Sequence, residues 1–386
     1  MRKFFEFQNA AKINCGEKAL DTIGKELSVL GAKKPILITS SNAAKLGVKE
    51  KVVESLKNGG IDEMVLADVA PAFVDATYAQ GVKATYISER CDAIVAVGGD
   101  EAMDVAKVVK LLLSQDWDEI LPIAQECVIE SKRIPLIAIP SENGSGKEAN
   151  GYMEVGEYYL SASALIPNVV IIDEDVAMAA PTREIAACGV YALANAIESY
   201  LEAEDADVST VYAEKAIRLL ADNLLIAVTD GDNKDACRAT ALASTLAGIA
   251  YGANPYGAAH ALAEGLHAVT GELLEEMFAL SILPAVAIAR KKYENKVKKL
   301  YYLLVGADEY AETPSSERAD KAVSKVEELL AKLGEATGLA TKISQTKITR
   351  ETFGKIADAA VDKRASITAN GPIGKDVFID MLNRVY

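Results

Sequence analysis

The sequence predicts an α/β domain with a Rossmann-like parallel sheet in residues 1–180, followed by an all-helical domain in residues 181–386. Between residue 35 and about residue 175, short continuous apolar runs alternate with longer stretches of helical periodicity. Such runs, which do not alternate polar with apolar residues, are typical of strands buried on both faces of a parallel sheet. After Pro181 these runs stop and helical patterns continue to the end of the chain. We therefore place a domain boundary near residue 180.

Five strands are predicted in the first domain. They are the runs PILITS, MVLAD, AIVAVGGD, LIAIPS and VVIID, which begin at residues 35, 64, 93, 136 and 169. The segments between them, such as residues 45–60 and 76–90, have the length and polarity of helices. Because parallel strands need a crossover connection, these segments are expected to cover the faces of the sheet.

Amphipathic helices are predicted throughout the second domain. One of them covers residues 319–334, where apolar side chains recur at helical spacing at Ala322, Val326, Leu329, Leu330 and Leu333. Gly334 follows the last of these and predicts the end of the helix, because glycine is favoured just past a helix C-terminus.

Composition and charge narrow the class of protein. The 386 residues are 50% hydrophobic and 25% charged, with a net charge of −15, so we expect neither a nucleic-acid partner nor an anionic membrane surface. No run approaches the roughly 20 apolar residues of a membrane span, and the N-terminal MRKFFEFQNAAK lacks the apolar core of a signal peptide. The five cysteines are scattered singly, which fits a reducing compartment and buried thiols. We expect a cytoplasmic protein with a small-molecule substrate.

Two small-residue turns follow predicted strands. Gly98 and Gly99 lie between a strand and a helix that begins near Glu101, an arrangement whose backbone N–H groups can face a phosphate. The alternative is an ordinary tight turn, which also favours glycine. A second turn follows the next strand and contains Ser141, Gly144, Ser145 and Gly146; its alternative is a plain surface turn.

Together, these turns resemble those of the iron-containing (group III) alcohol dehydrogenase family, whose fold is shared with glycerol dehydrogenase and dehydroquinate synthase. That family carries G-G-G-S-x-x-D-x-A-K after one strand and P-T-T-x-G-T-G-S-E after the next. The chain has GGDEAMDVAK at residues 98–107 and PSENGSGKE at residues 140–148. The resemblance continues through DEDVAMAAP, GVYALANAIESY and ASTLAGIAYGANPYGAAHALAEG to Asn370.

The resemblance implies that NAD or NADP binds to the first domain. The cofactor-binding positions carried over are Gly98, Gly99, Asp104, Lys107, Ser141, Gly144 and Ser145. The acidic residue that often holds the adenosine ribose in this family is Ser40 here, which could admit NADP or indicate that no dinucleotide binds. Carboxylates at Asp100, Glu101 and Glu142 replace family Gly, Ser and Thr residues and would repel a diphosphate, although Lys147 could offset one of them.

The family's metal site is altered at most of its positions. A divalent metal is held there by one Asp and three His and polarises the alcohol oxygen. The matching positions are Tyr191, Asn195, His260 and, depending on a one-residue gap, Leu274 or Glu275, while a further family His is Glu264. Because one histidine of the set survives, we expect no tightly bound iron or zinc; Asn195, His260 and Glu275 are weak candidates for a hard cation.

Four residues are candidates for chemistry without the family's metal. His260, Glu264 and His267 are spaced i, i+4 and i+7, one helical face, which could form a second metal site or a general acid/base relay. Tyr191 could donate a proton to a developing alkoxide. The alternatives are histidines that cap or line a core helix and a tyrosine that fills the volume of the lost metal.

Two functions follow from these observations. The first is an NAD(P)-dependent oxidoreductase that interconverts a small alcohol with an aldehyde or ketone without the family's metal. The second is a family member without hydride transfer that acts as a ligand-binding, structural or regulatory subunit. In either case the resemblance implies a homodimer or larger homo-oligomer.

Overall fold

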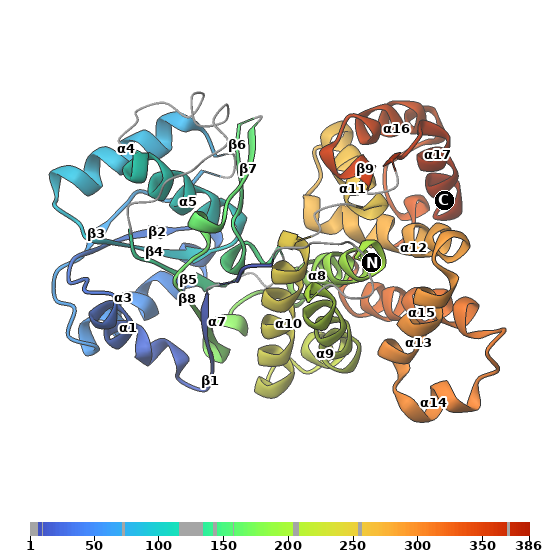
Figure 1. Cartoon of the computed structure of the whole chain (residues 1–386), viewed down its shortest axis with the longest axis horizontal. Coiled ribbons are helices and arrows are strands. Elements are labelled where there is room, and N and C mark those ends of the chain that lie inside the picture. The colour runs from blue at the N-terminus through green and yellow to red at the C-terminus, as the bar shows by residue number, and fades with distance from the viewer. Residues whose placement is uncertain are drawn as a thin grey trace. The chain divides into compact units, whose positions relative to one another are not determined.

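The computed structural model describes residues 7–9, 11–71, 74–115, 134–141, 145–156, 158–203, 208–253, 257–368 and 371–386. The chain divides into two compact units, Gln8–Ala180 and Pro181–Tyr386, with Phe7 grouped in the second. The first is an α/β unit and the second a helical unit (Figure 1).

The α/β unit is built on a six-stranded sheet of order β1-β8-β5-β4-β2-β3. All neighbouring pairs are parallel. The strands are β1 (Lys12–Gly16), β2 (Pro35–Thr39), β3 (Val65–Leu66), β4 (Ala93–Gly98), β5 (Leu136–Pro140) and β8 (Val169–Asp173). The five predicted strands are confirmed. Strand β1 was not predicted, because it is an edge strand whose side chains are exposed or half-buried and lack a continuous apolar run.

Helices cover both faces of this sheet (Figure 1). Ile36, Ile94 and Ala96 pack in one apolar cluster with α4 (Ala76–Ser88) and α5 (Asp100–Gln115). Their strand neighbours, such as Leu37 and Val95, point the other way into a cluster with α1 (Ile23–Val29) and α3 (Val48–Asn58). Each fully buried aliphatic side chain contributes about 1.5–3 kcal/mol, so this period-two pattern fixes the register of the sheet. The remaining elements are α2 (Ser41–Lys45), α7 (Glu174–Ala177) and an antiparallel pair, β6 (Tyr152–Val155) and β7 (Tyr158–Ser161).

The order of the strands identifies where this sheet can bind a ligand. The chain passes from β2 outward to β3 and then returns to β4 on the other side of β2. In open parallel sheets, ligands bind outside the carboxyl ends of the strands at this reversal. Ser40 follows β2 and Gly98 ends β4, so the two residues flank the reversal.

The second unit consists mainly of helices. They are α8 (Thr182–Glu202), α9 (Ser209–Thr229), α10 (Lys234–Ala253), α11 (Ala258–Thr270), α12 (Leu274–Lys292), α13 (Glu294–Val305), α14 (Ala307–Glu312), α15 (Arg318–Thr337), α16 (Phe353–Val361) and α17 (Lys375–Arg384). The predicted helical class of this unit is confirmed. It also contains a short antiparallel pair, β9 (Ile367–Thr368) and β10 (Gly371–Pro372).

The predicted helix end at Gly334 was wrong. Helix α15 continues through Gly334 to Thr337 and is capped by Gly338, whose φ of 71° is left-handed. A Cβ at Gly334 would lie 3.0 Å from the carbonyl oxygen of Leu339. The glycine therefore allows the chain that follows the helix to pass close to it.

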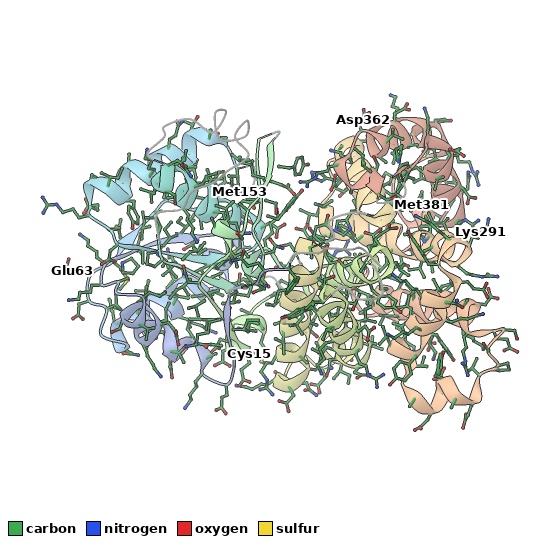
Figure 2. The ribbon with its side chains drawn as sticks, in the orientation of Figure 1. Cys15, Glu63, Met153, Lys291, Asp362 and Met381 are labelled. Atoms are coloured by element: carbon green, nitrogen blue, oxygen red, sulfur yellow. The ribbon has the colours of Figure 1, made fainter. Side chains whose placement is uncertain are left out.

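Each unit buries apolar side chains in a core of its own. Met153 in the α/β unit and Met381 in the helical unit are both 0% exposed (Figure 2). Cys91, Cys188 and Cys237 are buried as expected, whereas Cys15 on the edge strand is exposed; Cys127 lies outside the described residues. Within the described part of the chain, none of the helices combines the length and apolar character needed to cross a membrane.

Substituting Gly98 with alanine tests the close approach at the strand reversal. Gly98 has φ +138°, and a Cβ there would overlap the Ser40 side chain. We expect Gly98→Ala to reduce the free energy of unfolding by about 2–4 kcal/mol, since backbone strain adds to overpacking. Gly47→Ala is the control, because Gly47 has φ +73° but no atom near its missing Cβ; it should cost about 1–2 kcal/mol. Equal losses in urea unfolding would contradict the overlap.

Candidate functional site

The turn after β4 and the residue after β2 form the floor of a candidate nucleotide site. The N–H of Ser40 donates to the carbonyl of Val97, and the Ser40 hydroxyl accepts from the N–H of Ala43 at 3.0 Å, which caps α2. Ser40 is fully buried. Its hydroxyl thus supports the turn, and the missing side chain of Gly98 leaves space for that contact.

Ser141 joins this floor from the neighbouring strand. It follows β5, and its N–H donates to the carbonyl of Gly98 at 3.3 Å. Its hydroxyl is buried and has no hydrogen-bond partner within the described residues. Gly99 begins the passage into α5, where its carbonyl accepts from the N–H of Met103. The structure therefore brings Ser40, Gly98, Gly99 and Ser141 to one edge of the sheet, while Gly144 and Glu142 lie outside the described residues.

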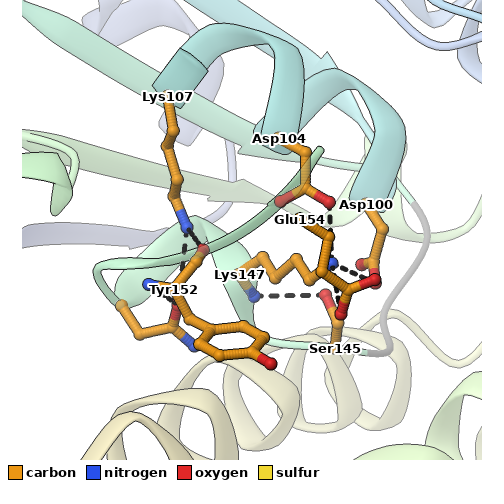
Figure 3. A network of polar contacts seen from close by, with 8 residues as sticks. Asp100, Asp104, Lys107, Ser145, Lys147, Tyr152 and Glu154 are labelled. Carbon is orange, nitrogen blue, oxygen red and sulfur yellow. Dashed lines mark hydrogen bonds and ion pairs between the residues drawn. The ribbon is translucent and has the colours of Figure 1, made fainter. Parts of the chain in front are cut away.

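Lys147 forms the centre of an ionic cluster next to this turn (Figure 3). Its ammonium nitrogen lies 2.7 Å from Asp104 Oδ2, 3.4 Å from Asp100 Oδ2 and 3.5 Å from Glu154 Oε1. The offset by Lys147 that the sequence suggested is therefore present as direct ion pairs. Three carboxylates and one ammonium leave the cluster with a formal charge of −2 when all four groups are ionised.

Burial shifts the pKa values of two residues on α5. It raises the pKa of Asp104 to about 7, although Lys147 acts in the opposite direction. Asp104 Oδ1 is buried without a hydrogen-bond partner in the described part of the chain. Burial also lowers the pKa of Lys107 to about 7. The Lys107 ammonium donates to the carbonyl of Tyr152 at 2.5 Å and to Asn150 Oδ1 at 3.4 Å, so it ties α5 to β6.

A second candidate centre lies in the helical unit, around His260 in the first turn of α11. Four residues share one face of α8 at i, i+4, i+7 and i+11: Tyr191, Asn195, Glu198 and Glu202. The Glu198 carboxylate accepts from the N–H of Ala259 at 2.6 Å, from the N–H of His260 at 3.3 Å, and from His260 Nδ1. A Cβ on Gly257 would overlap that carboxylate, so a side chain there would displace Glu198 from these contacts.

Aromatic rings surround the His260 imidazole. Tyr251 stacks on it with ring centroids 4.4 Å apart, Phe278 meets it edge-on at 4.7 Å, and the Tyr191 ring lies 5.8 Å away. His260 is 2% exposed, and its Nε2 has no hydrogen-bond partner within the described residues. Because Glu198 holds a proton on Nδ1, the neutral ring presents a lone pair at Nε2.

The residues that the resemblance assigns to the family's metal positions have side chains poorly suited to iron or zinc. Tyr191 stacks on Phe278 with centroids 4.2 Å apart, and Asn195 is a fully buried amide. Glu275 stands in the first turn of α12. Among the described residues, no three His, Cys, Asp or Glu side chains are grouped so that they could hold a metal ion. One imidazole with an amide and a phenol is a poor donor set for either metal.

The structure does not join His260 and His267 in a relay. His267 is exposed, and its Nδ1 bonds to the carbonyl of Glu272 at 2.6 Å. The carboxylate on the His260 ring comes from Glu198 on α8, and sequence analysis missed it. Its position seven residues after Tyr191, on the same helical face, was the available signal.

Comparison with known proteins identifies the family. Residues 10–174 match the profile "Iron-containing alcohol dehydrogenase", and residues 185–386 match "Fe-containing alcohol dehydrogenase family, C-terminal". The chain belongs to the iron-containing alcohol dehydrogenase family. The resemblance inferred from the two glycine turns is thereby confirmed.

Relatives within the iron-containing alcohol dehydrogenase family match much of the chain. It is 28% identical over 308 residues to "Choline dehydrogenase" of Bacillus subtilis, a match covering 78% of this chain and 76% of that protein. It is 27% identical to "NAD-dependent methanol dehydrogenase" of Bacillus methanolicus, covering 64% and 66% respectively. The solved structure of a 1,3-propanediol oxidoreductase superposes with a TM-score of 0.90 at 22% identity, covering 100% of both chains. This last likeness confirms the fold.

Removal of the Lys147 ammonium tests the ionic cluster. Folding raises the pKa of Asp104 from its ordinary 3.8 to about 7, so ionisation of this group lowers stability as pH rises across that window. Since Lys147 lowers this pKa, Lys147→Met should destabilise more at pH 8, by about 3–5 kcal/mol, than at pH 5, by roughly 1–2 kcal/mol. Urea unfolding at both pH values measures the difference.

The double variant Asp104→Asn, Lys147→Met is the matched control for this prediction. It removes the buried charge along with its partner, so it should recover most of the stability lost at pH 8. A loss for Lys147→Met that is independent of pH would show that Asp104 does not ionise against Lys147.

Proposed function

We propose that this chain is an NAD(P)-dependent oxidoreductase that interconverts a small alcohol with an aldehyde or ketone. In this proposal His260, rather than a metal ion, assists the reaction at the substrate oxygen by exchanging a proton with it. The observation that carries the proposal is the buried Glu198–His260 pair, in which Glu198 engages Nδ1 and Nε2 has no hydrogen-bond partner among the described residues. An imidazole oriented by a carboxylate through one nitrogen is poised for proton transfer through the other. The names of relatives within the family, alcohol dehydrogenases among them, support this class of reaction.

The floor of the α/β unit supports the cofactor part of the proposal. The missing side chain at Gly98 allows a close approach of the backbone, and the Ser141 hydroxyl is buried without a partner among the described residues. Gly98, Gly99, Ser141 and Ser145 would hold the dinucleotide, which supplies or accepts a hydride when bound. With Ser40 in place of an acid, no carboxylate at that position repels a 2′-phosphate, so the proposal includes both NAD and NADP.

His260 would move the proton. In aldehyde reduction, a protonated His260 gives its Nε2 proton to the developing alkoxide, and the neutral ring takes it back in alcohol oxidation. The Glu198 carboxylate stabilises the imidazolium, and the rings of Tyr251 and Phe278 exclude water from it. Positioned acid/base groups contribute about 10²–10⁴-fold in rate. Tyr191, whose ring lies beside His260, is the second candidate donor.

The alternative function is a ligand-binding or regulatory subunit without hydride transfer. The cluster around Lys147 favours it, because Asp100, Asp104 and Glu154 together outnumber the one ammonium in contact with them. Their excess negative charge opposes a diphosphate at the neighbouring turn. Binding of NADH and NADPH to the purified chain separates the two functions, since the alternative predicts none at millimolar concentration.

Substitution of the two histidines tests the catalytic role. We expect the purified chain to oxidise NADH or NADPH with short-chain aldehydes, and His260→Gln to lower kcat by at least about 100-fold. His267→Gln is the control; its exposed ring bonds to a backbone carbonyl, and kcat should stay within about twofold. Dialysis against a chelator should leave the rate unchanged. Equal rates for both variants would refute the role of His260.

Substitution of Glu198 tests whether it positions His260. Glu198→Gln keeps the shape of the side chain but loses one acceptor, so the His260 ring should populate both tautomers. We expect kcat to fall about tenfold, while the KM for the aldehyde stays within about twofold. Nitrogen NMR of the ring atoms reports the tautomer. The chain has two histidines, so His267→Gln assigns the signals. A single unchanged tautomer in Glu198→Gln would contradict the positioning role.

A further inference from the structure

A cavity of about 280 Å³ lies within the helical unit. Its walls come from α8, the first turn of α11, α12 and the segment around β10 that leads into α17. These helices all belong to the C-terminal unit in Figure 1. Most of the wall is aliphatic, with Ile197, Leu201, Ile282, Val286, Ile288 and Pro372. Tyr191, Asn195 and His260 are not among the described residues that line it.

Glu202 forms the polar end of this cavity. Its Oε1 accepts from the Tyr293 hydroxyl at 3.0 Å and lies 3.7 Å from the Lys292 ammonium. Its Oε2 is buried without a hydrogen-bond partner among the described residues. The other carboxylate in the wall, Glu198, already accepts from the N–H groups of α11. Because Glu202 lines the cavity and the Glu198 carboxylate is occupied by α11, we assign the Glu202 carboxylate as the acceptor for a ligand.

The size and chemistry of the cavity define its ligand. A dry cavity of about 150 Å³ holds benzene, so this one accommodates a molecule of roughly ten heavy atoms. A buried carboxylate oxygen without a donor is costly, and a ligand donor removes that cost. We propose that the cavity is a second binding site, separate from the His260 centre, for a small aliphatic molecule with a terminal hydrogen-bond donor, either an ammonium or a hydroxyl group, placed against Glu202.

The negative charge of the wall excludes an anionic ligand. Among the described residues that line the cavity, two are acidic, Glu198 and Glu202, and one is basic, Lys292, whose side chain is 43% exposed and screened by solvent. An aliphatic carboxylate would lose its hydration and meet like charge at the polar end. The site should therefore discriminate between molecules of equal length by their head group.

Calorimetric titration of the full chain, without dinucleotide, tests the proposal. The probes are hexylammonium, hexan-1-ol and hexanoate, which share one aliphatic chain. We expect saturable binding at one site per chain for hexylammonium, hexan-1-ol or both, and at least about tenfold weaker binding of hexanoate. The stronger of the first two identifies the head group.

Two variants assign the binding to this cavity. Ala289→Leu fills part of the cavity and should lower the affinity for the probe at least about tenfold. Ala287→Leu lies on the same helix but outside the lining, and its affinity should stay within about twofold. Glu202→Gln should weaken hexylammonium about tenfold. Absence of saturable binding, equal binding of hexanoate, or full binding by Ala289→Leu would each overturn the site.

This test is independent of the proposed oxidoreductase activity. It uses no cofactor and measures heat rather than turnover, so an inactive chain can still bind the probe. Conversely, loss of probe binding in Ala289→Leu with unchanged NAD(P)H oxidation would separate the cavity from the site of the reaction. A hexanol signal that His260→Gln removes and Ala289→Leu leaves intact would assign that binding to the reaction site and overturn the cavity proposal.

Discussion

The hydrogen bonds of the Glu198 carboxylate are the interaction on which the His260 centre of the helical unit depends. The carboxylate accepts the N–H groups of Ala259 and His260 at the start of α11 and also bonds to His260 Nδ1. A side chain on α8 thereby caps a helix whose first four N–H groups have no partner of their own. The same contact orients the imidazole, and it uses the space that the missing side chain of Gly257 leaves. It also supplies part of the cavity wall.

At the glycine turn of the α/β unit, charged side chains stand where the resemblance predicts uncharged residues. The sequence carries Asp100 where the resemblance predicts glycine and Lys147 where it predicts serine, and the two side chains lie 3.4 Å apart. Lys147 also neutralises Asp104, whose second oxygen stays without a donor among the described residues. The Asp100 carboxylate and the Lys147 ammonium therefore form an ion pair, although the two residues are 47 positions apart in sequence. Such pairing keeps a buried carboxylate tolerable while leaving the Gly98 backbone in place.

Sequence patterns predicted the fold well, and they named His260 and the turn at Gly98, around which the two candidate sites are built. The buried strands were evident because both of their faces are apolar, which leaves a continuous run. Strand β1 gave no such signal, since an edge strand needs less apolar surface, and Gly334 was misassigned because glycine also permits close passage of chain beside a helix. Glu198 was missed for a different reason. Helical spacing places it on the same face of α8 as Tyr191, but its contact with His260 joins residues 62 positions apart, and no periodicity predicts which carboxylate meets that ring.

Stability alone does not account for the Glu198–His260 pair. Burying a carboxylate and an imidazole is costly, and replacing such a pair with well-packed apolar side chains is often neutral or stabilising. A helix N-terminus can be capped by a short neutral side chain, so capping does not require a glutamate from another helix. The surrounding rings of Tyr191, Tyr251 and Phe278 already supply an apolar site that a leucine or phenylalanine could fill. What the pair adds, and apolar residues cannot, is a basic nitrogen of fixed orientation, which is the property that proton transfer to a substrate oxygen needs.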